Sequence, residues 1–127
     1  ANLFVANFLG TANILEGSVK GEGATRSFEV AGGGSIPVPV GVEVPAGAKL
    51  VFRPQYATIG TVETDAVPLS GTIAHREFLG ATVRYGVEVG KATVLVDAPF
   101  HSGDGLLAPG SQTVLGIKPA SVLWLAD

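Results

Sequence analysis

The sequence contains no cysteine and no methionine, and only 15% of its 127 residues are charged. Without cysteine, the chain can form neither disulfides nor thiolate metal sites. Because translation starts at methionine, we expect a chain that was processed or cut from a longer protein. The 8 Lys and Arg residues are outnumbered by 11 Asp and Glu residues. This acidic balance argues against a nucleic-acid partner, because affinity for a phosphate backbone depends mainly on clustered basic side chains.

Long hydrophobic runs are missing as well. The longest stretch without charge covers residues 1–15, and a membrane-spanning helix needs about 20 apolar residues. This stretch also contains three asparagines. A signal peptide is not indicated either, because the sequence does not show a positively charged segment followed by a small-residue cleavage site. We therefore expect a soluble chain.

Glycine and β-branched residues are abundant instead. The 18 glycines and 8 prolines divide the chain into short segments. Residues 83–89 alternate apolar with small or charged residues, which predicts a half-buried strand with Arg84 and Glu88 facing water. Residues 93–96 lack this alternation, which predicts a strand that is buried on both faces or lies near a barrel seam. Many short strands predict an all-β sandwich or barrel. Only residues 1–10 have the apolar spacing of a short helix.

Two landmarks occur twice along the chain, in the same order. Residues 8–10 (Phe-Leu-Gly) recur 70 positions later as residues 78–80. Residues 49–54 (Lys-Leu-Val-Phe-Arg-Pro) match residues 114–119 (Val-Leu-Gly-Ile-Lys-Pro) at a shift of 65. The shared order favours an internal duplication over chance similarity of short segments.

The second landmark ends on an apolar anchor in both places, Ile59 after the first and Trp124 after the second. We predict that residues 11–66 form one copy and residues 67–127 the other, each a small barrel. Neither copy alone buries much surface. We therefore expect the two copies to share an interface or exchange strands within one compact unit.

A basic residue followed by proline closes each repeated strand, as Arg53-Pro54 and Lys118-Pro119. Proline has no N–H to donate and ends the ladder, and the residue before it stays extended. Arg53 and Lys118 should therefore point outward at the ends of their strands. They are either solvated charges on capped strands or contacts to a partner.

Known catalytic and ligand-binding motifs are matched only in part. Residues 86–92 superficially resemble a phosphate-binding loop, but the spacing is one residue short and Ala92 replaces the Ser or Thr that binds Mg²⁺. Residues 101–104 (His-Ser-Gly-Asp) contain the residue types of a catalytic triad, but adjacent side chains cannot supply its geometry. Neither histidine has partners at metal-ligand spacing. We predict no catalytic residue, no bound cofactor, no metal site and no enzymatic activity for this chain.

The densest polar cluster is His75-Arg76-Glu77, just before Phe78. One interpretation is a strand or bulge whose charges face water. The other is a contact to a partner domain or a small anion, because His75 and Arg76 can both donate to an oxyanion. The large aromatic side chains are predicted to lie in the core, namely Phe4, Phe8, Phe28, Phe52, Phe78 and Trp124.

The landmarks together resemble the TOBE-type C-terminal region of ABC importer ATPases, nearest to importers of ferric iron and of polyamines such as spermidine and putrescine. The resemblance covers the whole chain, and the order of its landmarks is more specific than any one of them. They are residues 4–10 (Phe-Val-Ala-Asn-Phe-Leu-Gly), 13–19 (Asn-Ile-Leu-Glu-Gly-Ser-Val), 52–55 (Phe-Arg-Pro-Gln), 75–80 (His-Arg-Glu-Phe-Leu-Gly), 83–85 (Val-Arg-Tyr) and 116–119 (Gly-Ile-Lys-Pro).

The resemblance implies a fold of tandem OB-like β-barrels with interlocked strands, in which residues 1–10 are the helix leading out of an ATPase domain. That domain, with its ATP and Mg²⁺, would precede Ala1. The implied location is cytoplasmic, at the inner face of the cell membrane, where the barrels pair with those of a second subunit and act on the membrane subunits through the ATPase domain. The family usually has an acidic residue at the position of Gln55, so a charge-dependent role there is in doubt.

Three functions compete at this stage. The first is a regulatory and dimerisation domain of an ATP-binding subunit, with Arg53, Gln55, His75, Arg76, Glu77 and Lys118 as candidate interaction residues. The second is a small-solute or oxyanion sensor, with Ser70, Thr72, Lys118 and Ser121 as candidate ligands. The third is a nucleic-acid-binding OB module, which the acidic charge disfavours.

Overall fold

The computed structural model describes residues 12–100 and 105–125, and within them the fold is all-β. This confirms the predicted fold class, while the expected helix over residues 1–10 lies outside the described residues. None of the helices in the described part is long and apolar enough to cross a membrane. The elements are β1 (Asn13–Leu15), β2 (Gly17–Lys20), η1 (Gly23–Thr25), β3 (Ser27–Val30), β4 (Ser35–Pro37), β5 (Lys49–Phe52), η2 (Pro54–Tyr56), β6 (Ala57–Ile59), β7 (Val67–Phe78), β8 (Thr82–Val89), β9 (Ala92–Pro99), β10 (Gln112–Ile117), η3 (Pro119–Ser121) and β11 (Leu123–Leu125).

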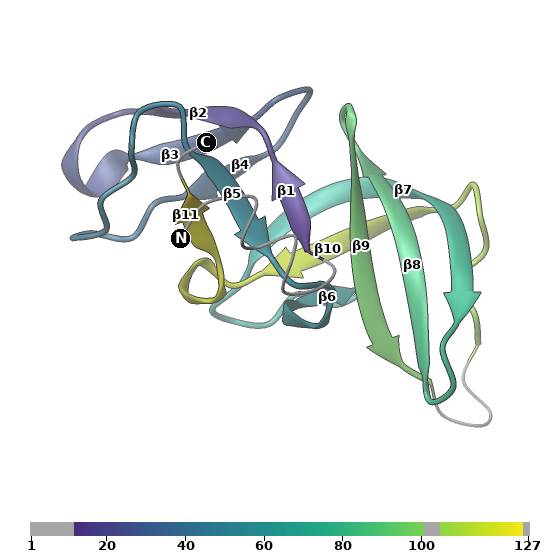
Figure 1. The fold of residues 1–127 in the computed structure, drawn as a ribbon. Coiled ribbons are helices and arrows are strands. Elements are labelled where there is room, and N and C mark those ends of the chain that lie inside the picture. The colour runs from purple at the N-terminus through teal and green to yellow at the C-terminus, as the bar shows by residue number, and fades with distance from the viewer. Residues whose placement is uncertain (1–11, 101–104, 126–127) are drawn as a thin grey trace.

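The strands form three antiparallel sheets, in the orders β1-β5-β11, β2-β3-β4 and β6-β10-β7-β8-β9. In the five-stranded sheet, β6 at one edge packs against β9 at the other, so that this sheet is nearly closed into a barrel. In Figure 1 the long strands β7, β8 and β9 lie on one side of the molecule and the short strands β2, β3 and β4 on the other.

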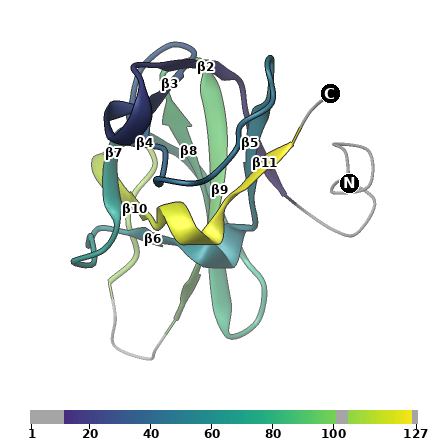
Figure 2. The same ribbon diagram turned by 90° about the vertical axis from the view of Figure 1, so that its left-hand side faces the viewer.

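Strands are exchanged between the two halves of the chain. The last strand, β11, pairs with β5, whereas β6 pairs with β10, and Figure 2 shows β11 beside β5. The two pairings have the same register: Trp124 lies opposite Leu50, and Ile59 lies opposite Leu115. These pairs are related by the shift of 65 positions found in the sequence.

The strand pairing divides the fold into two β-units, each of which contains strands from both halves of the chain. The first β-unit consists of β11, β5, β1, β2, β3 and β4, and the second β-unit consists of β6, β10, β7, β8 and β9. The strand order is the same in both when β1 and β2, which only Glu16 separates, are taken together as the counterpart of β7. The strand pairing thus crosses the proposed division at residues 66 and 67 twice. The division itself remains a prediction.

Equivalent glycines allow β2 to lie close to β3 and β7 to lie close to β8. A Cβ on Gly17 would overlap the carbonyl oxygen of Glu29, and a Cβ on Gly71 would lie 2.7 Å from the carbonyl oxygen of Glu88. Ser18 follows Gly17 and lies opposite Glu29, and Thr72 follows Gly71 and lies opposite Glu88. The register of the two strand pairs is therefore also equivalent. The absence of a side chain at both glycines is therefore a packing requirement.

Proline ends the repeated strands as predicted. β5 ends at Phe52 and β10 ends at Ile117, and Pro54 and Pro119 then open the short 3-10 helices η2 and η3. The chain turns at these helices and crosses to the other unit: β5 of the first unit leads into β6 of the second, and β10 of the second leads into β11 of the first.

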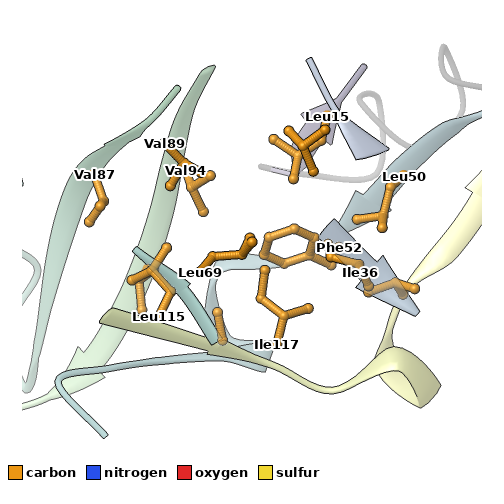
Figure 3. Packing of buried hydrophobic residues seen from close by; sticks show 14 of the residues in the cluster. Leu15, Ile36, Leu50, Phe52, Leu69, Val87, Val89, Val94, Leu115 and Ile117 are labelled. Atoms are coloured by element: carbon orange, nitrogen blue, oxygen red, sulfur yellow. The ribbon is translucent and has the colours of Figure 1, made fainter. Parts of the chain in front are cut away.

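One hydrophobic core joins the two units. Its buried members come from both, and Figure 3 shows Leu69 of β7 and Phe52 of β5 side by side between Val94 of β9 and Leu50 of β5. The alternation predicted for residues 83–89 is confirmed, because Val83, Tyr85, Val87 and Val89 are buried.

The prediction for the large aromatic residues was right for two of the described ones and wrong for one. Phe28 and Phe52 are buried and Trp124 is half-buried, but Phe78 is 55% exposed. Phe78 lies at the end of β7, beyond the last residue of that strand that pairs with β10. Its ring is nearly perpendicular to that of Phe100, with ring centroids 5.6 Å apart. Phe4 and Phe8 lie outside the described residues.

An asparagine connects the units at their seam. Asn13 of β1 is buried, and its side-chain amide donates to the carbonyl oxygen of Leu95 at 2.8 Å and accepts from the N–H of Leu95 at 2.7 Å. Residues 93–96 alternate in burial rather than being buried on both faces. The other prediction for them, a position near a barrel seam, is the one the structure supports.

Candidate functional site

The sequence-predicted candidates are spread over three places in the fold. Arg53 precedes η2 and Gln55 lies in it, Lys118 follows β10, and His75, Arg76 and Glu77 lie near the end of β7. They therefore do not form one site.

Lys118 lies beside two carboxylates of the loop before β7. Its Nζ is 3.0 Å from Glu63 Oε2 and 3.7 Å from Asp65 Oδ1. The hydrogen bond with Glu63 and the charge of Asp65 raise the pKa of Lys118. An anion bound at Lys118 would have to compete with both acids. This argues against Lys118 as the main cation of an oxyanion site.

Arg53 is the counterpart of Lys118 under the shift of 65. It is half-buried and caps the N-terminus of η2 with an extended backbone, while Gln55 in the middle of η2 is exposed. η2 packs against β9 of the second unit. Gln55 also lines a shallow hollow of about 240 Å³ together with Thr58, Thr61 and Asp97.

The His75-Arg76-Glu77 cluster lies on β7 just after a β-bulge between Ile73 and His75. A bulge or strand was one of the two interpretations of this segment, and the structure contains both features. Because side chains alternate along a strand, His75 and Glu77 lie on one face of β7 and Arg76 on the other. His75 lies over Gly86, where a Cβ would overlap the imidazole ring. His75 and Arg76 thus do not converge on a common anion.

Arg76 and its cross-strand neighbour Tyr85 hold the backbone of the loop before β10. Arg76 Nη1 donates to the carbonyl oxygen of Leu107 at 2.9 Å, and the N–H of Leu107 donates to the hydroxyl of Tyr85 at 3.2 Å. Both backbone groups of Leu107 are therefore fixed by side chains of the β7–β8 ladder. Sequence reasoning missed this role of Tyr85, because alternation indicated only that it faces the core.

Glu77 belongs to a row of charges on the outer face. It pairs with Arg84 across β7 and β8, and Arg84 pairs with Asp97 across β8 and β9. Arg84 forms a bidentate pair with Asp97, in which Nε donates to Oδ1 at 2.7 Å and Nη2 donates to Oδ2 at 3.0 Å. The hydrogen bonds with Asp97 raise the pKa of Arg84 further. The expectation that Arg84 faces water is only partly right, because its side chain is 25% exposed.

The candidates for the sensor function fall into two groups. Ser70 and Thr72 alternate with the buried Leu69 and Ile73 and thus lie on the outer face of β7, where Thr72 is opposite Glu88. Ser121 ends η3, and its N–H donates to the carbonyl oxygen of Lys118. The carboxylate beside Thr72 disfavours an anion at that position.

Within residues 12–100 and 105–125, no group of three or more His, Asp or Glu side chains could hold a metal ion. The segment that resembles a phosphate-binding loop, residues 86–92, is the β8–β9 hairpin, in which Gly90 has a φ of +60°. It does not open a helix, so it cannot offer the helix N-terminus that such loops use. The triad-like residues 101–104 lie outside the described residues.

The second unit has a hollow of about 370 Å³ at its end. Its walls are mainly apolar and come from β6, β8, β9 and the loop before β10. They include Ile59, Val83, Tyr85, Ala98, Phe100 and Leu107.

The arrangement defines the class of the molecule: an all-β module of two interlocked OB-like units. A solved structure has the same fold. It is the cytoplasmic molybdate-binding protein ModG in a form with molybdate bound, similar with a TM-score of 0.71 and 18% sequence identity over 91% of this chain and 96% of that one. The sequence model of the TOBE domain matches residues 50–125. The chain belongs to the TOBE domain family.

Curated relatives show the context in which this domain occurs. The chain is 32% identical to the Fe(3+) ions import ATP-binding protein FbpC of Rhizobium etli over 93% of its own length, and 31% identical to FbpC 1 of Rhizobium meliloti over 96%. It is 34% identical to the sn-glycerol-3-phosphate import ATP-binding protein UgpC of Salmonella typhi over 64% of its length. The chain spans about a third of the two FbpC proteins and less of UgpC. The resemblance to ABC importer ATPase subunits is thereby confirmed.

Proposed function

We propose that this chain is the regulatory and dimerisation domain of the ATP-binding subunit of an ABC importer for a small solute, and that it is not catalytic by itself. The observation that carries this proposal is the match of residues 50–125 to the TOBE domain, together with similarity over nearly all of this chain to part of two import ATP-binding proteins. The relatives differ in the solutes their names state, so the solute is left unspecified.

The partners follow from this assignment. An attached ATPase domain would supply ATP and Mg²⁺, the same domain of a second subunit would form the homodimer, and the membrane subunits would be reached through the ATPase domain. The complex would lie at the cytoplasmic face of the cell membrane. Nucleic acid is not expected, because the chain has a net charge of −3.

The interlocked strands suit a regulatory role. Because β11 pairs with β5 and β6 pairs with β10, one unit cannot shift without moving strands of the other. A displacement at either end would therefore be transmitted through the module as a body. Control requires only that a signal binds one arrangement of the dimer better than another.

Light scattering after size exclusion tests the dimerisation part of this proposal on the 127-residue chain. We expect a mass that shifts from monomer to dimer as concentration rises through the micromolar range. A strictly monomeric chain at all concentrations would contradict dimerisation. An ATP hydrolysis assay on the same sample should give only the background rate, and measurable turnover would contradict a non-catalytic domain.

The second candidate is an oxyanion-sensing module, which the fold shared with ModG favours. A thermal-shift panel of molybdate, tungstate, sulfate and phosphate tests it, with ferric citrate, putrescine and spermidine included for other solutes. A ligand at 100 times its dissociation constant adds about 2.7 kcal/mol of stability, which for a domain of this size is on the order of 5 °C. A flat panel would reject the sensor and leave the first proposal standing.

A further inference from the structure

One ladder of hydrogen bonds is complete in the second β-unit and interrupted in the first. In the second unit, β10 pairs with β7 as far as Thr72. The pairing continues at Ile73, whose N–H donates to the carbonyl oxygen of Ser111 at 2.9 Å and whose carbonyl oxygen accepts from the N–H of Gly110 at 2.6 Å. In the first unit, the equivalent pairing of β5 with β1 ends at Leu15 and does not continue along β2.

The position of a turn explains the shorter ladder. A glycine with positive φ lies in the turn before each strand, Gly47 (φ +74°) before β5 and Gly110 (φ +89°) before β10. Under the shift of 65 positions, Gly110 corresponds to Pro45, so the turn of the first unit comes two residues later. It is closed by the N–H of Ala48, which donates to the carbonyl oxygen of Pro45 at 3.0 Å. Gly47 and Ala48 therefore belong to the turn, whereas their counterparts belong to β10.

The missing pairs leave a slot between two segments of backbone. A hollow of about 280 Å³ lies between β2 and the turn, lined by residues 17–19 and 44–48. Residues 17–19 are the counterparts of residues 71–73, and residues 46–48 are the counterparts of residues 111–113, which pair with one another in the second unit. The slot is thus the place to which the ladder of the first unit does not extend.

The β2 side of the slot presents main-chain groups that have no strand partner. The N–H of Ala31 donates to the carbonyl oxygen of Glu16, so the main-chain groups of Glu16 point to β3. These groups alternate in direction along an antiparallel strand. Those of Ser18 therefore also point to β3, and those of Gly17 and Val19 point into the slot. In the described part of the chain, neither Gly17 nor Val19 has a backbone partner on this side.

The chemistry of the slot fits an extended, uncharged peptide. Its lining residues carry no charge, and apart from the hydroxyl of Ser18 their polar atoms belong to the main chain. An open strand edge binds an extended peptide through main-chain hydrogen bonds, as an added strand. The second unit shows which kind of segment occupies the equivalent place, namely residues 110–112 (Gly-Ser-Gln), which are uncharged.

We propose that this slot binds a short extended segment of another polypeptide with small, uncharged side chains, which adds a strand to the edge of β2. The segment lies against β2 as residues 110–112 lie against β7. One of its N–H groups donates to the carbonyl oxygen of Val19, and the carbonyl oxygen of its next residue accepts from the N–H of Val19. This inference goes beyond the proposed function and does not depend on dimerisation or on an attached ATPase domain.

Amide hydrogen exchange measured by NMR on the 127-residue chain tests the slot before any peptide is added. The amide hydrogens of Gly17 and Val19 should exchange at least tenfold faster than those of Gly71 and Ile73, which are paired in the second unit. Equal protection of the two pairs would show that the chain itself fills the slot, and it would overturn the proposal.

The probe for binding is the acetylated and amidated peptide Pro-Gly-Ser-Gln, which has the sequence of residues 109–112. At millimolar concentration it should shift the amide signals of Gly17 and Val19 and slow their exchange. The matched control peptide carries N-methylglycine in place of glycine, which removes the donor to Val19, and should bind at least tenfold more weakly. No shift with several millimolar of the first peptide, or equal binding of the two peptides, would refute the added strand.

Two variants alter different sides of the slot, so that one remains informative if the other does not fold. Ala46→Leu fills the slot from the turn, and Val19→Pro removes the N–H on β2. Either should weaken peptide binding at least tenfold. The matched control Ala120→Leu makes the first change at an exposed position of η3 and should leave binding unchanged. Undiminished binding in a folded slot variant, or an equal loss in Ala120→Leu, would contradict the site.

Discussion

The side-chain amide of Asn13 makes two hydrogen bonds with the backbone of Leu95, like those between neighbouring strands. Its Nδ2 donates to the Leu95 carbonyl oxygen at 2.8 Å, and its Oδ1 accepts from the Leu95 N–H at 2.7 Å. The two residues are 82 positions apart and belong to different β-units. The amide satisfies an N–H and a C=O of β9, the edge strand of its sheet, on the side away from β8. The Asn13 amide thereby links the two β-units where a backbone amide would otherwise be needed.

Replacement of Asn13 should destabilise the fold without changing it. Asn13→Ala leaves the backbone groups of Leu95 without their partner in a largely buried place, which costs about 1–3 kcal/mol. Urea unfolding followed by circular dichroism measures this. The exposed Gln112→Ala on β10 is the control and should change stability by less than about 0.5 kcal/mol. Equal effects of the two variants would show that the Asn13 amide does not stabilise the seam.

Gly71 should tolerate no side chain. A Cβ there would lie 2.6 Å from Val87 Cγ1 and 2.7 Å from the Glu88 carbonyl oxygen, so Gly71→Ala must push β7 away from β8 at a cost of about 1–3 kcal/mol. Thermal unfolding compares it with Gly105→Ala, whose new methyl group would meet nothing within 4 Å. A Gly71→Ala protein as stable as the Gly105→Ala protein would contradict the packing requirement.

Glu29 should make stability depend on pH in the acid range. Hydrogen bonds from Ser35 at 2.6 Å and Ser27 at 2.7 Å lower the pKa of Glu29, chiefly through Ser35. A lowered folded-state pKa gives stability that is present above the ordinary glutamate pKa of about 4.3 and is lost as pH falls through the folded value. Ser35→Ala should raise the pKa of Glu29 in an NMR titration. Ser18→Ala, which removes a hydroxyl opposite Glu29 on β2, should not.

The Arg84–Asp97 pair should contribute through its two hydrogen bonds. The side chains are 25% and 15% exposed, so Asp97→Ala is expected to cost about 1–2 kcal/mol, more than an exposed ion pair. A double-mutant cycle with Arg84→Ala isolates the pairwise energy. A coupling energy near zero would assign the loss to packing alone. Because the pKa of Arg84 is raised from an already high value, the pair should keep its strength throughout the neutral range.

Much of the fold could be predicted from local patterns. The alternation in residues 83–89 indicated a strand and its buried face, because side chains on a strand point to opposite faces in turn. Pro54 and Pro119 indicated where two ladders end, because proline lacks a donor. The repeated segments indicated a shift of 65, and the strand pairs Trp124–Leu50 and Ile59–Leu115 have that same shift.

The candidate residues were harder to interpret from sequence. The adjacency of His75 and Arg76 allowed a shared anion as one of two interpretations, but strand geometry places them on opposite faces, and Arg76 binds the backbone of Leu107. The conspicuous charge of Lys118 is balanced by Glu63, which lies 55 positions earlier in the chain. Alternation predicted only that Tyr85 faces the core, and it did not show that its hydroxyl accepts from the N–H of Leu107.

The sequence by itself determined the all-β class, the strand at residues 83–89 with its buried face, the ends of β5 and β10, and the family of the chain, because these depend on side-chain alternation, on glycine and proline, and on the order of short landmarks. Only the tertiary structure decided which strands cross between units, that Asn13 closes the seam at Leu95, and that Phe78 is exposed. These features depend on contacts between residues tens of positions apart. Such contacts are chosen by how whole sheets pack, and no local pattern encodes that choice.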